Sequence, residues 1–226
     1  MRQLRWMVFW TLYALVSAFW FLLTAAGELV RPGTIGWTAQ RWSGAFRHLA
    51  RSVLGVRLQL AGTVPAKPSV IAARHESFFE ALGLLDMLNN PAVVLKAELL
   101  AVPFWRWFAR ANGAMALDRD AGPAAMRRLI AGARAAAAAG RHILIFPEGT
   151  RALPGEWLPV QPGVSALATL LRLPVVPVAL RAGHVWPRDG VARPGTVRLR
   201  FGEPIPPGLP REEFETLLAA ALREEP

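Results

Sequence analysis

Residues 74–80, Arg-His-Glu-Ser-Phe-Phe-Glu, stand between a short apolar run and a helical pattern. Before them, residues 68–73 (Pro-Ser-Val-Ile-Ala-Ala) form an apolar segment opened by a proline, as is typical of a short β-strand. After them, apolar residues recur at helical spacing between Phe78 and Leu88. The spacing therefore predicts a strand-to-helix turn with His75 at its mouth, where α/β folds place their chemistry.

His75 and Glu80 are the first candidates for catalytic groups. Glu80 falls five positions after His75, in the first turn of the predicted helix. If His75 stays outside the helix, its imidazole can fold back to the Glu80 carboxylate, and such a pair of a base and an orienting group can deprotonate a hydroxyl. A simpler interpretation stays open, because Ser77 and Glu80 also have the spacing of a capping box that only satisfies backbone N–H groups.

The composition favours a membrane surface over nucleic acid as a partner. The 226 residues suffice for one domain of ordinary size with a small appendage. Lys and Arg number 26 against 16 Asp and Glu, which leaves a net charge of +10 on a chain that is 53% hydrophobic. No RNA-binding motif or zinc-ligand pattern occurs, and a basic, hydrophobic chain with 9 Trp suits an anionic membrane surface. The absence of cysteine excludes disulfides and cysteine nucleophiles.

The N-terminal region predicts a membrane-associated helix. Residues 6–27 carry no formal charge, and as a helix they would be about 33 Å long, enough to cross a hydrocarbon core of about 30 Å. A cleaved signal peptide is the main alternative, because Arg2 and Arg5 resemble its charged start, but its apolar core would be unusually long. Arginines flank the run on both sides, so two helices dipping into one leaflet fit as well as a full span.

Residues 35–54 predict a second, amphipathic helix with an apolar stripe and a basic side. The stripe consists of Ile35, Trp42, Phe46, Leu49 and Val53, and the basic side consists of Arg41, Arg47, His48 and Arg51. We interpret this helix as lying in a headgroup interface, with a surface helix packed on the domain as the alternative. Residues 1–54 are thus predicted to be membrane-anchoring helices, and residues 55–226 a globular domain.

The globular domain alternates between strand-like and helical segments. Strands are predicted at residues 56–60, 68–73, 92–95, 113–117, 142–146, 175–180 and 197–201, and helices at residues 78–88, 123–139, 163–171 and 211–223. Residues 99–108 have aromatic side chains on several faces, which suits a buried helix or a second surface in contact with lipid. The alternation predicts an α/β fold with a largely parallel, mixed sheet flanked by helices.

Polar groups follow two further predicted strands. Residues 118–119 (Asp-Arg) follow one strand, and residues 148–151 (Glu-Gly-Thr-Arg) follow another. Arg119 and Arg151 offer fork-shaped donors for phosphate, and Gly149 lets the backbone approach a ligand closely. Taken singly, these segments suit a surface ion pair and a turn. Together with the His–Glu pair and a membrane anchor, they predict that a base acts on a phosphorylated amphiphile.

The chain resembles the glycerolipid acyltransferases, and specifically the 1-acylglycerol-3-phosphate acyltransferases. The family's His-x4-acid motif matches His75 and Glu80, and its Phe-Pro-Glu-Gly-Thr-Arg motif is present whole at residues 146–151. Less specific stretches of the family are similar to the strand before Asp118, to residues 95–99 and to residues 175–178. The resemblance covers roughly residues 56–206.

The sequence departs from the family pattern at several positions. Glu80 is the acid where most relatives have Asp, and Arg74 and Glu76 replace the Asn and Gln that often flank the His. Gln161 stands where relatives often carry Lys, which removes one possible anion contact. These differences bear more on the identity of the acceptor than on the reaction class.

The resemblance implies an O-acyltransferase that converts lysophosphatidate to phosphatidate in phospholipid biosynthesis. His75 would take the proton from the free 2-hydroxyl as this oxygen attacks an acyl thioester, and Glu80 would hold the imidazole tautomer. The resemblance assigns the acceptor phosphate to Arg119, Glu148, Gly149, Thr150 and Arg151. It also implies the inner, cytoplasmic membrane as the location, with the catalytic domain facing the cytoplasm.

The implied reaction needs neither a metal nor a redox cofactor, and its donor is a thioester of CoA or of acyl carrier protein. An acyl-enzyme route is not expected, since the sequence has neither a Gly-x-Ser-x-Gly elbow nor a cysteine. The expected partners are lysophosphatidate, the acyl thioester and an anionic membrane surface, and not nucleic acid. Two alternatives stay open: acylation of another lysolipid, such as a lyso-ornithine lipid or a lysophospholipid, and a non-catalytic lipid-binding protein.

Overall fold

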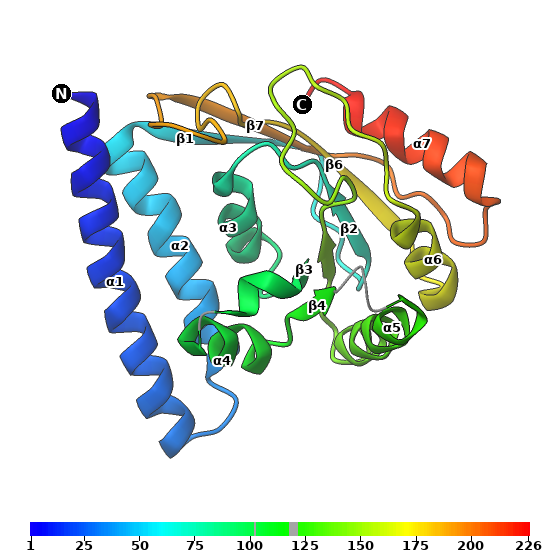
Figure 1. The fold of residues 1–226 in the computed structure, drawn as a ribbon, viewed down its shortest axis with the longest axis horizontal. Coiled ribbons are helices and arrows are strands. Elements are labelled where there is room, and N and C mark those ends of the chain that lie inside the picture. Colours follow the sequence, from blue (N-terminus) through cyan, green and yellow to red (C-terminus); the bar gives the residue numbers. More distant parts are fainter. Residues whose placement is uncertain (102, 118–121) are drawn as a thin grey trace.

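The N-terminal part of the chain forms a hairpin of two long helices. In the computed structural model, which describes residues 1–101, 103–117 and 122–226, α1 (Arg2–Val30) and α2 (Ile35–Leu54) run antiparallel and side by side (Figure 1). Both predicted N-terminal helices are therefore confirmed. α2 ends at Gly55, whose φ of 72° lies in the left-handed region that glycine adopts without strain.

In the described residues, seven strands form one sheet with the order β1-β7-β6-β2-β5-β3-β4. The strands are β1 (Val56–Ala61), β2 (Val70–Ala73), β3 (Ala92–Lys96), β4 (Met115–Leu117), β5 (Ile143–Ile145), β6 (Val175–Arg181) and β7 (Gly195–Phe201). The neighbouring strands pair parallel except β6 and β7, which pair antiparallel. The prediction of a largely parallel, mixed sheet is confirmed.

Helices cover both faces of this sheet (Figure 1). One face carries α5 (Gly122–Ala138), α6 (Pro162–Leu171) and α7 (Arg211–Arg223), and the other carries α3 (Phe78–Met87) and the α1–α2 hairpin. The 3₁₀ helix η1 (Ala97–Ala101) and α4 (Pro103–Ala111) follow β3 and lie beside the hairpin. The helices and strands begin and end within a few residues of their predicted positions.

Both faces of the central strands are buried. Ile71 and Ala73 of β2 belong to a core shared with the hairpin and α3, whereas Val70 and Ala72 belong to a second core shared with α5, α6 and α7. All four of these side chains are fully buried. A sheet covered on both faces accounts for the continuous apolar runs in its strands.

The apolar stripe of α2 belongs to the protein core, which corrects our interpretation of this helix. Ile35, Trp42 and Phe46 are buried, and the Phe46 ring contacts Phe9 of α1 and Trp186 of the β6–β7 loop. The alternative, a helix packed on the domain, therefore holds for this stripe. Helical periodicity identified an apolar face but could not identify what covers it. The hairpin and the sheet share one core across the predicted boundary at residue 55.

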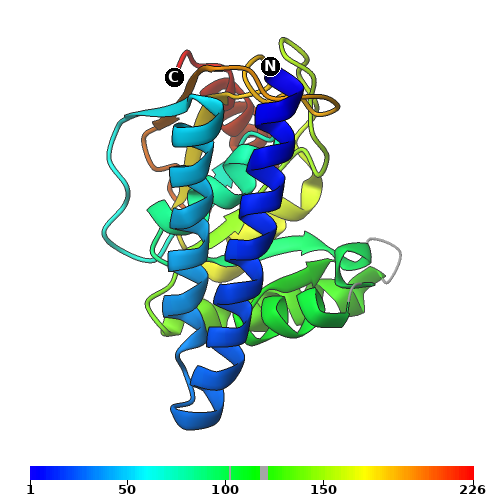
Figure 2. The same ribbon diagram turned by 90° about the vertical axis from the view of Figure 1, so that its left-hand side faces the viewer.

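The outer face of α1 is apolar and exposed. This stripe consists of Leu4, Val8, Leu15, Phe19 and Leu22, which are between 42% and 73% exposed. Among the described helices, α1 alone is long and apolar enough to cross a membrane by length and composition. Figure 2 shows that the turn between α1 and α2 projects past the rest of the molecule. The exposed apolar stripe of the hairpin therefore lies on α1.

For residues 99–108 the sequence allowed a buried helix or an exposed surface, and the described residues of this segment include both buried and exposed side chains. Phe108 of α4 is buried, and its ring packs against Trp42 at a centroid distance of 5.6 Å. Leu99 and Trp107 are exposed. The segment thus contributes to the core with one side and to the surface with the other.

Candidate active site

His75 lies in the turn between β2 and α3, and its imidazole folds back onto the first turn of the helix. The distance between His75 Nδ1 and Glu80 Oε1 is 2.8 Å. The Glu80 side chain is fully buried, whereas the His75 ring is 19% exposed and lines a cavity. When Nδ1 carries the proton, it donates to Glu80 and leaves the Nε2 lone pair available as a base. The contact that the spacing predicted is therefore present.

The capping box that we kept as an alternative is also present. Ser77 is the N-cap of α3, and its Oγ accepts a hydrogen bond from the Phe79 N–H at 2.9 Å. Glu80 Oε1 accepts from the Ser77 and Glu76 N–H groups, and Glu80 Oε2 accepts from Ser77 Oγ at 2.7 Å. One carboxylate thus caps the helix and holds the imidazole. The two interpretations are compatible, because the cap fixes the carboxylate that orients His75.

The segment after β5 supports His75 from the other side. The Phe146 ring stacks on the imidazole at a centroid distance of 4.2 Å. The His75 N–H donates to Glu148 Oε2 at 2.8 Å, and the His75 carbonyl accepts from the Ala152 N–H at 2.7 Å. Residues 146–152 therefore fix both the ring and the backbone of His75.

Glu148 holds this loop and does not line the cavity, so its assignment to the acceptor phosphate needs correction. Glu148 is 4% exposed and its carboxylate accepts a hydrogen bond from the His75 N–H, so it lies behind the His75 backbone and away from the cavity wall. Burial raises the pKa of Glu148 to about 7, against the opposing effects of the His75 N–H and the Arg74 charge. The glutamate at position 148 suggested a residue of the binding site, but its burial depends on contacts with His75 and Arg74, which are distant in sequence.

Arg74 and Glu76, which flank His75, form a buried ion pair. Both side chains are 1% exposed, and Arg74 Nε lies 2.7 Å from Glu76 Oε1. Glu76 Oε2 accepts hydrogen bonds from the Ala182 and Gly183 N–H groups, and the Arg74 guanidinium stacks on Trp157 at 3.9 Å. The Arg74 charge also lies 3.8 Å from Glu148. Such a pair is tolerated in the interior only because hydrogen bonds satisfy most of its polar atoms.

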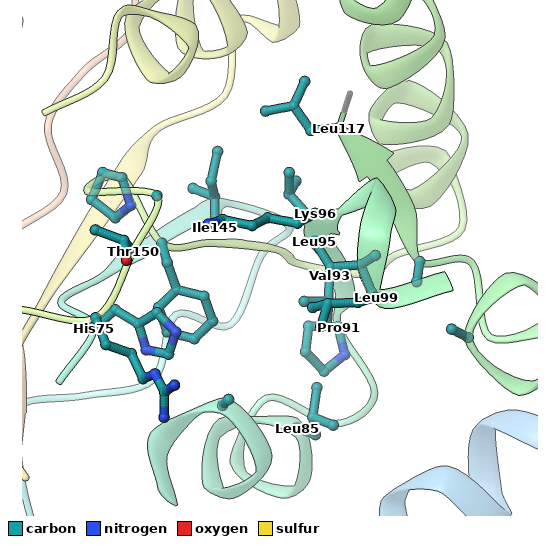
Figure 3. Close-up of a pocket in the computed structure, with 18 of the residues that line it drawn as sticks. His75, Leu85, Pro91, Val93, Leu95, Lys96, Leu99, Leu117, Ile145 and Thr150 are labelled. Atoms are coloured by element: carbon teal, nitrogen blue, oxygen red, sulfur yellow. The ribbon is translucent and has the colours of Figure 1, made fainter. Parts of the chain in front are cut away.

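The cavity beside His75 has a volume of about 1050 Å³ and is apolar over most of its wall. Figure 3 shows His75 and Thr150 on one side, and Leu85, Val93 and Leu99 on the other. The hairpin contributes to the wall through Phe21 and Trp42. On the His75 side of the cavity, we call His75 and the buried residues behind it the base end, and the adjoining residues of the wall the anion end. The base end consists of His75, Glu80, Arg74, Glu76 and Glu148, and the anion end consists of Thr150, Arg151 and Arg188. The cavity thus suits an apolar chain with a charged head.

The anion end contains two arginines, of which the sequence indicated one. Arg151 follows the strand β5 as predicted, and its Nη1 donates to the Arg188 carbonyl at 3.2 Å. Gly149, with a φ of 68°, turns the chain between Glu148 and Thr150. Arg188 comes from the β6–β7 loop and has no motif around it that could have identified it. Arg119 lies outside the described residues.

Lys96 and Gln161 also line the cavity. Lys96 ends β3, and Figure 3 shows its side chain extending from this strand toward Ile145. Sequence reasoning did not assign Lys96 to the site, although one of the chain's two lysines directly follows a predicted strand here. Gln161 is the N-cap of α6, and its N–H donates to the Pro147 carbonyl at 2.9 Å. The position of Gln161 on the wall makes its departure from the family pattern relevant to ligand binding.

A family model described as Acyltransferase matches residues 55–181. The 1-acyl-sn-glycerol-3-phosphate acyltransferase of Pseudomonas aeruginosa is 34% identical over 198 residues, which cover 84% of this chain and 77% of that protein. The chain belongs to the acyltransferase family. The resemblance that the motifs indicated is therefore confirmed, and the chain is a transferase of acyl groups.

This acyltransferase is also similar to a yeast protein in sequence and to a bacterial protein in structure. The 1-acyl-sn-glycerol-3-phosphate acyltransferase of Saccharomyces cerevisiae is 31% identical over 168 residues, with 71% of this chain and 55% of that protein covered. The crystal structure of the 1-acyl-sn-glycerophosphate acyltransferase of Thermotoga maritima has a TM-score of 0.76, covers 99% of this chain and 96% of its own, and is 20% identical. That structure supports the fold of the acyltransferase, including its N-terminal hairpin.

Proposed function

We propose that this acyltransferase moves an acyl chain from a thioester to the 2-hydroxyl of lysophosphatidate and so forms phosphatidate. The observation that carries the proposal is a His–Glu pair on the wall of a largely apolar cavity that has two arginines at its charged end. A cavity of this kind matches an amphiphile whose hydroxyl lies between a phosphate and an acyl chain. The names of the two relatives at 34% and 31% identity support the same acceptor.

The proposed mechanism uses His75 as a general base. Nδ1–H donates to Glu80, so Nε2 accepts the proton of the 2-hydroxyl while the oxygen attacks the thioester carbonyl. Glu80 stabilises the imidazolium that forms. Collapse of the tetrahedral intermediate breaks the carbon–sulfur bond, and the thiolate leaves with the proton returned by His75. The products are a free thiol and a 2-acyl ester, and the base is regenerated.

The remaining walls of the site bind the substrates in this proposal. Arg151 donates to the acceptor phosphate through a charge-assisted contact, and the apolar side chains hold acyl groups. The donor is the thioester of CoA or of acyl carrier protein. Neither a metal ion nor a redox cofactor enters any step, since the chemistry is one acyl transfer and the uptake and return of one proton by His75.

The test is a matrix of donors and acceptors with the full-length protein. Acyl-CoA and acyl carrier protein thioesters are each combined with lysophosphatidate, lysophosphatidylglycerol and a lyso-ornithine lipid, and the products are identified by mass spectrometry. We expect phosphatidate as the main product. Gln161 favours testing the other lysolipids, because an uncharged residue stands on the cavity wall at the position where the resemblance places Lys in many relatives. Faster acylation of either alternative acceptor contradicts the proposed acceptor.

We also propose that the α1–α2 hairpin holds the enzyme on the anionic inner membrane, with the catalytic domain facing the cytoplasm. The exposed stripe of α1 and the exposed Arg41 and Arg51 of α2 support this placement. A variant with Leu15, Phe19 and Leu22 replaced by Ser should lose binding to anionic vesicles in a sedimentation assay. Leu217→Ser on the exposed side of α7 is the matched control. Equal sedimentation of all three proteins contradicts the placement.

A further inference from the structure

Arg188 brings a second guanidinium to the anion end from a distant segment of the chain. It lies in residues 182–194, the loop that joins β6 to β7. Arg151 Nη1 donates to the Arg188 carbonyl at 3.2 Å, and Arg188 Nη1 donates to the Arg151 carbonyl at 3.2 Å. Both residues line the cavity. The reciprocal hydrogen bonds hold the two arginines side by side on the cavity wall.

The two charges are poorly neutralised by the protein. Within residues 1–101, 103–117 and 122–226, Arg151 makes no ion pair, and Arg188 lies 3.8 Å from Asp189, whose side chain is 87% exposed. An exposed pair of this length contributes little. Two like charges on neighbouring residues of a cavity wall repel each other, and an anion with more than one charge that binds between them relieves this repulsion.

The loop that carries Arg188 is held in place by the core. Trp186, two residues earlier, is 2% exposed, and its ring contacts Trp6 and Phe9 of α1 and Phe46 of α2 at centroid distances of 5.2–5.5 Å. The Trp186 N–H donates to the Ala182 carbonyl at 2.8 Å, which closes a turn at the start of the loop. The backbone next to Arg188 is therefore anchored before any ligand binds, and such preorganisation strengthens binding.

We propose that Arg188 determines acceptor specificity by selecting, together with Arg151, a phosphate monoester over a phosphodiester. A monoester carries about −1.5 to −2 charges at neutral pH and three terminal oxygens, enough for two arginine forks. A diester carries one charge and keeps two terminal oxygens, so it offers the two arginines less charge and fewer acceptors than a monoester does. The inference rests on the proposed function and assigns the discrimination among lysolipids to a loop outside the motifs.

The experiment compares kcat/KM for lysophosphatidate and for lysophosphatidylglycerol with the same acyl chain. Arg188→Gln should lower kcat/KM for lysophosphatidate by about ten- to a hundredfold, the range for a charge-assisted contact, and should change the value for lysophosphatidylglycerol less than about twofold. Arg188→Lys keeps the charge without the fork and should fall between Arg188→Gln and the wild type. Arg198→Ala, an exposed arginine of β7 outside the cavity, is the control for net charge and should match the wild type.

The outcomes separate this inference from the proposed function. An equal decrease for both acceptors, or no decrease for Arg188→Gln, overturns the role of Arg188 while wild-type turnover of lysophosphatidate leaves the proposed function intact. Failure of the wild type to acylate lysophosphatidate overturns the proposed function itself. If each variant unfolds at the same temperature as the wild type, a folding defect is excluded as the cause of a decrease in kcat/KM.

Discussion

At the base end, His75 is held by side chains that are buried, whereas at the anion end the arginines that would bind the substrate are themselves accessible to solvent. Only 1% of the surface is exposed in each of Glu80, Arg74 and Glu76, while the Arg188 side chain is 42% exposed. A proton transfer requires fixed geometry, and buried hydrogen bonds provide it. A phosphate arriving from a membrane needs donors that it can reach. The two ends should therefore respond differently to substitution.

The largest expected effect is on turnover at the base end. His75→Ala should lower kcat by roughly 10²–10⁴-fold, and Glu80→Gln by a large part of this, since Gln cannot stabilise an imidazolium. Gln can still accept the backbone N–H groups and donate to Ser77 Oγ, so stability should stay close to that of the wild type. Steady-state kinetics and thermal unfolding measure both quantities.

The double variant sharpens this test. Because His75 and Glu80 act as a unit, His75→Ala with Glu80→Gln should lose little more activity than His75→Ala alone. Glu80→Asp keeps the charge and shortens the side chain, so it should retain partial activity. Wild-type turnover in Glu80→Gln would leave the capping role as the sole function of Glu80.

The next effect is on stability and again belongs to the base end. Glu76→Gln removes the nearer of the two carboxylates beside the buried Arg74 charge and leaves only Glu148 at 3.8 Å, so it should lower the free energy of unfolding by up to about 3–5 kcal/mol. The double variant Arg74→Asn, Glu76→Gln removes both charges and should recover part of this loss. Urea unfolding measures the difference. A double variant less stable than Glu76→Gln would show that the pair itself is not the cause.

The third effect is a pH dependence that comes from Glu148. Burial raises its pKa from 4.5 to about 7 in the folded protein, so between these values the folded state binds a proton that the unfolded state has lost. The free energy of unfolding should therefore fall as the pH rises through this window, by up to about 3 kcal/mol. Glu148→Gln should lack this component, which urea unfolding of both proteins at about pH 5 and about pH 7.5 would reveal. Parallel pH profiles would contradict it.

The smallest effect should come from the anion end and should leave stability unchanged. Arg151→Ala is expected to raise the apparent KM for lysophosphatidate by about ten- to a hundredfold, equivalent to about 1.5–3 kcal/mol, with the KM of the acyl donor unchanged. Initial rates with each substrate varied in turn give the two constants. Equal increases for donor and acceptor would remove Arg151 from the phosphate site.

The two ends also differ in how far the sequence could predict them. The contact between His75 and Glu80 was predictable because five residues of a strand-to-helix turn bring the two side chains together. Arg188 lies 37 residues from Arg151, and a long loop with no motif decides that they meet. The type of Glu148 indicated a site residue, but its burial depends on the His75 backbone and Arg74. Likewise, the period of α2 located its apolar stripe, and only the packing of Phe9 and Trp186 showed what covers it.

The Arg74–Glu76 pair constrains how this sequence can change over generations. Removing one charge weakens the buried network around the other, so the neutral Asn and Gln that the family resemblance places at these positions can be reached by single substitutions only through a less stable protein. The two positions should therefore be inherited together, as a charged pair in one lineage and as a neutral pair in another. The histidine between them can stay constant while its neighbours switch as a unit.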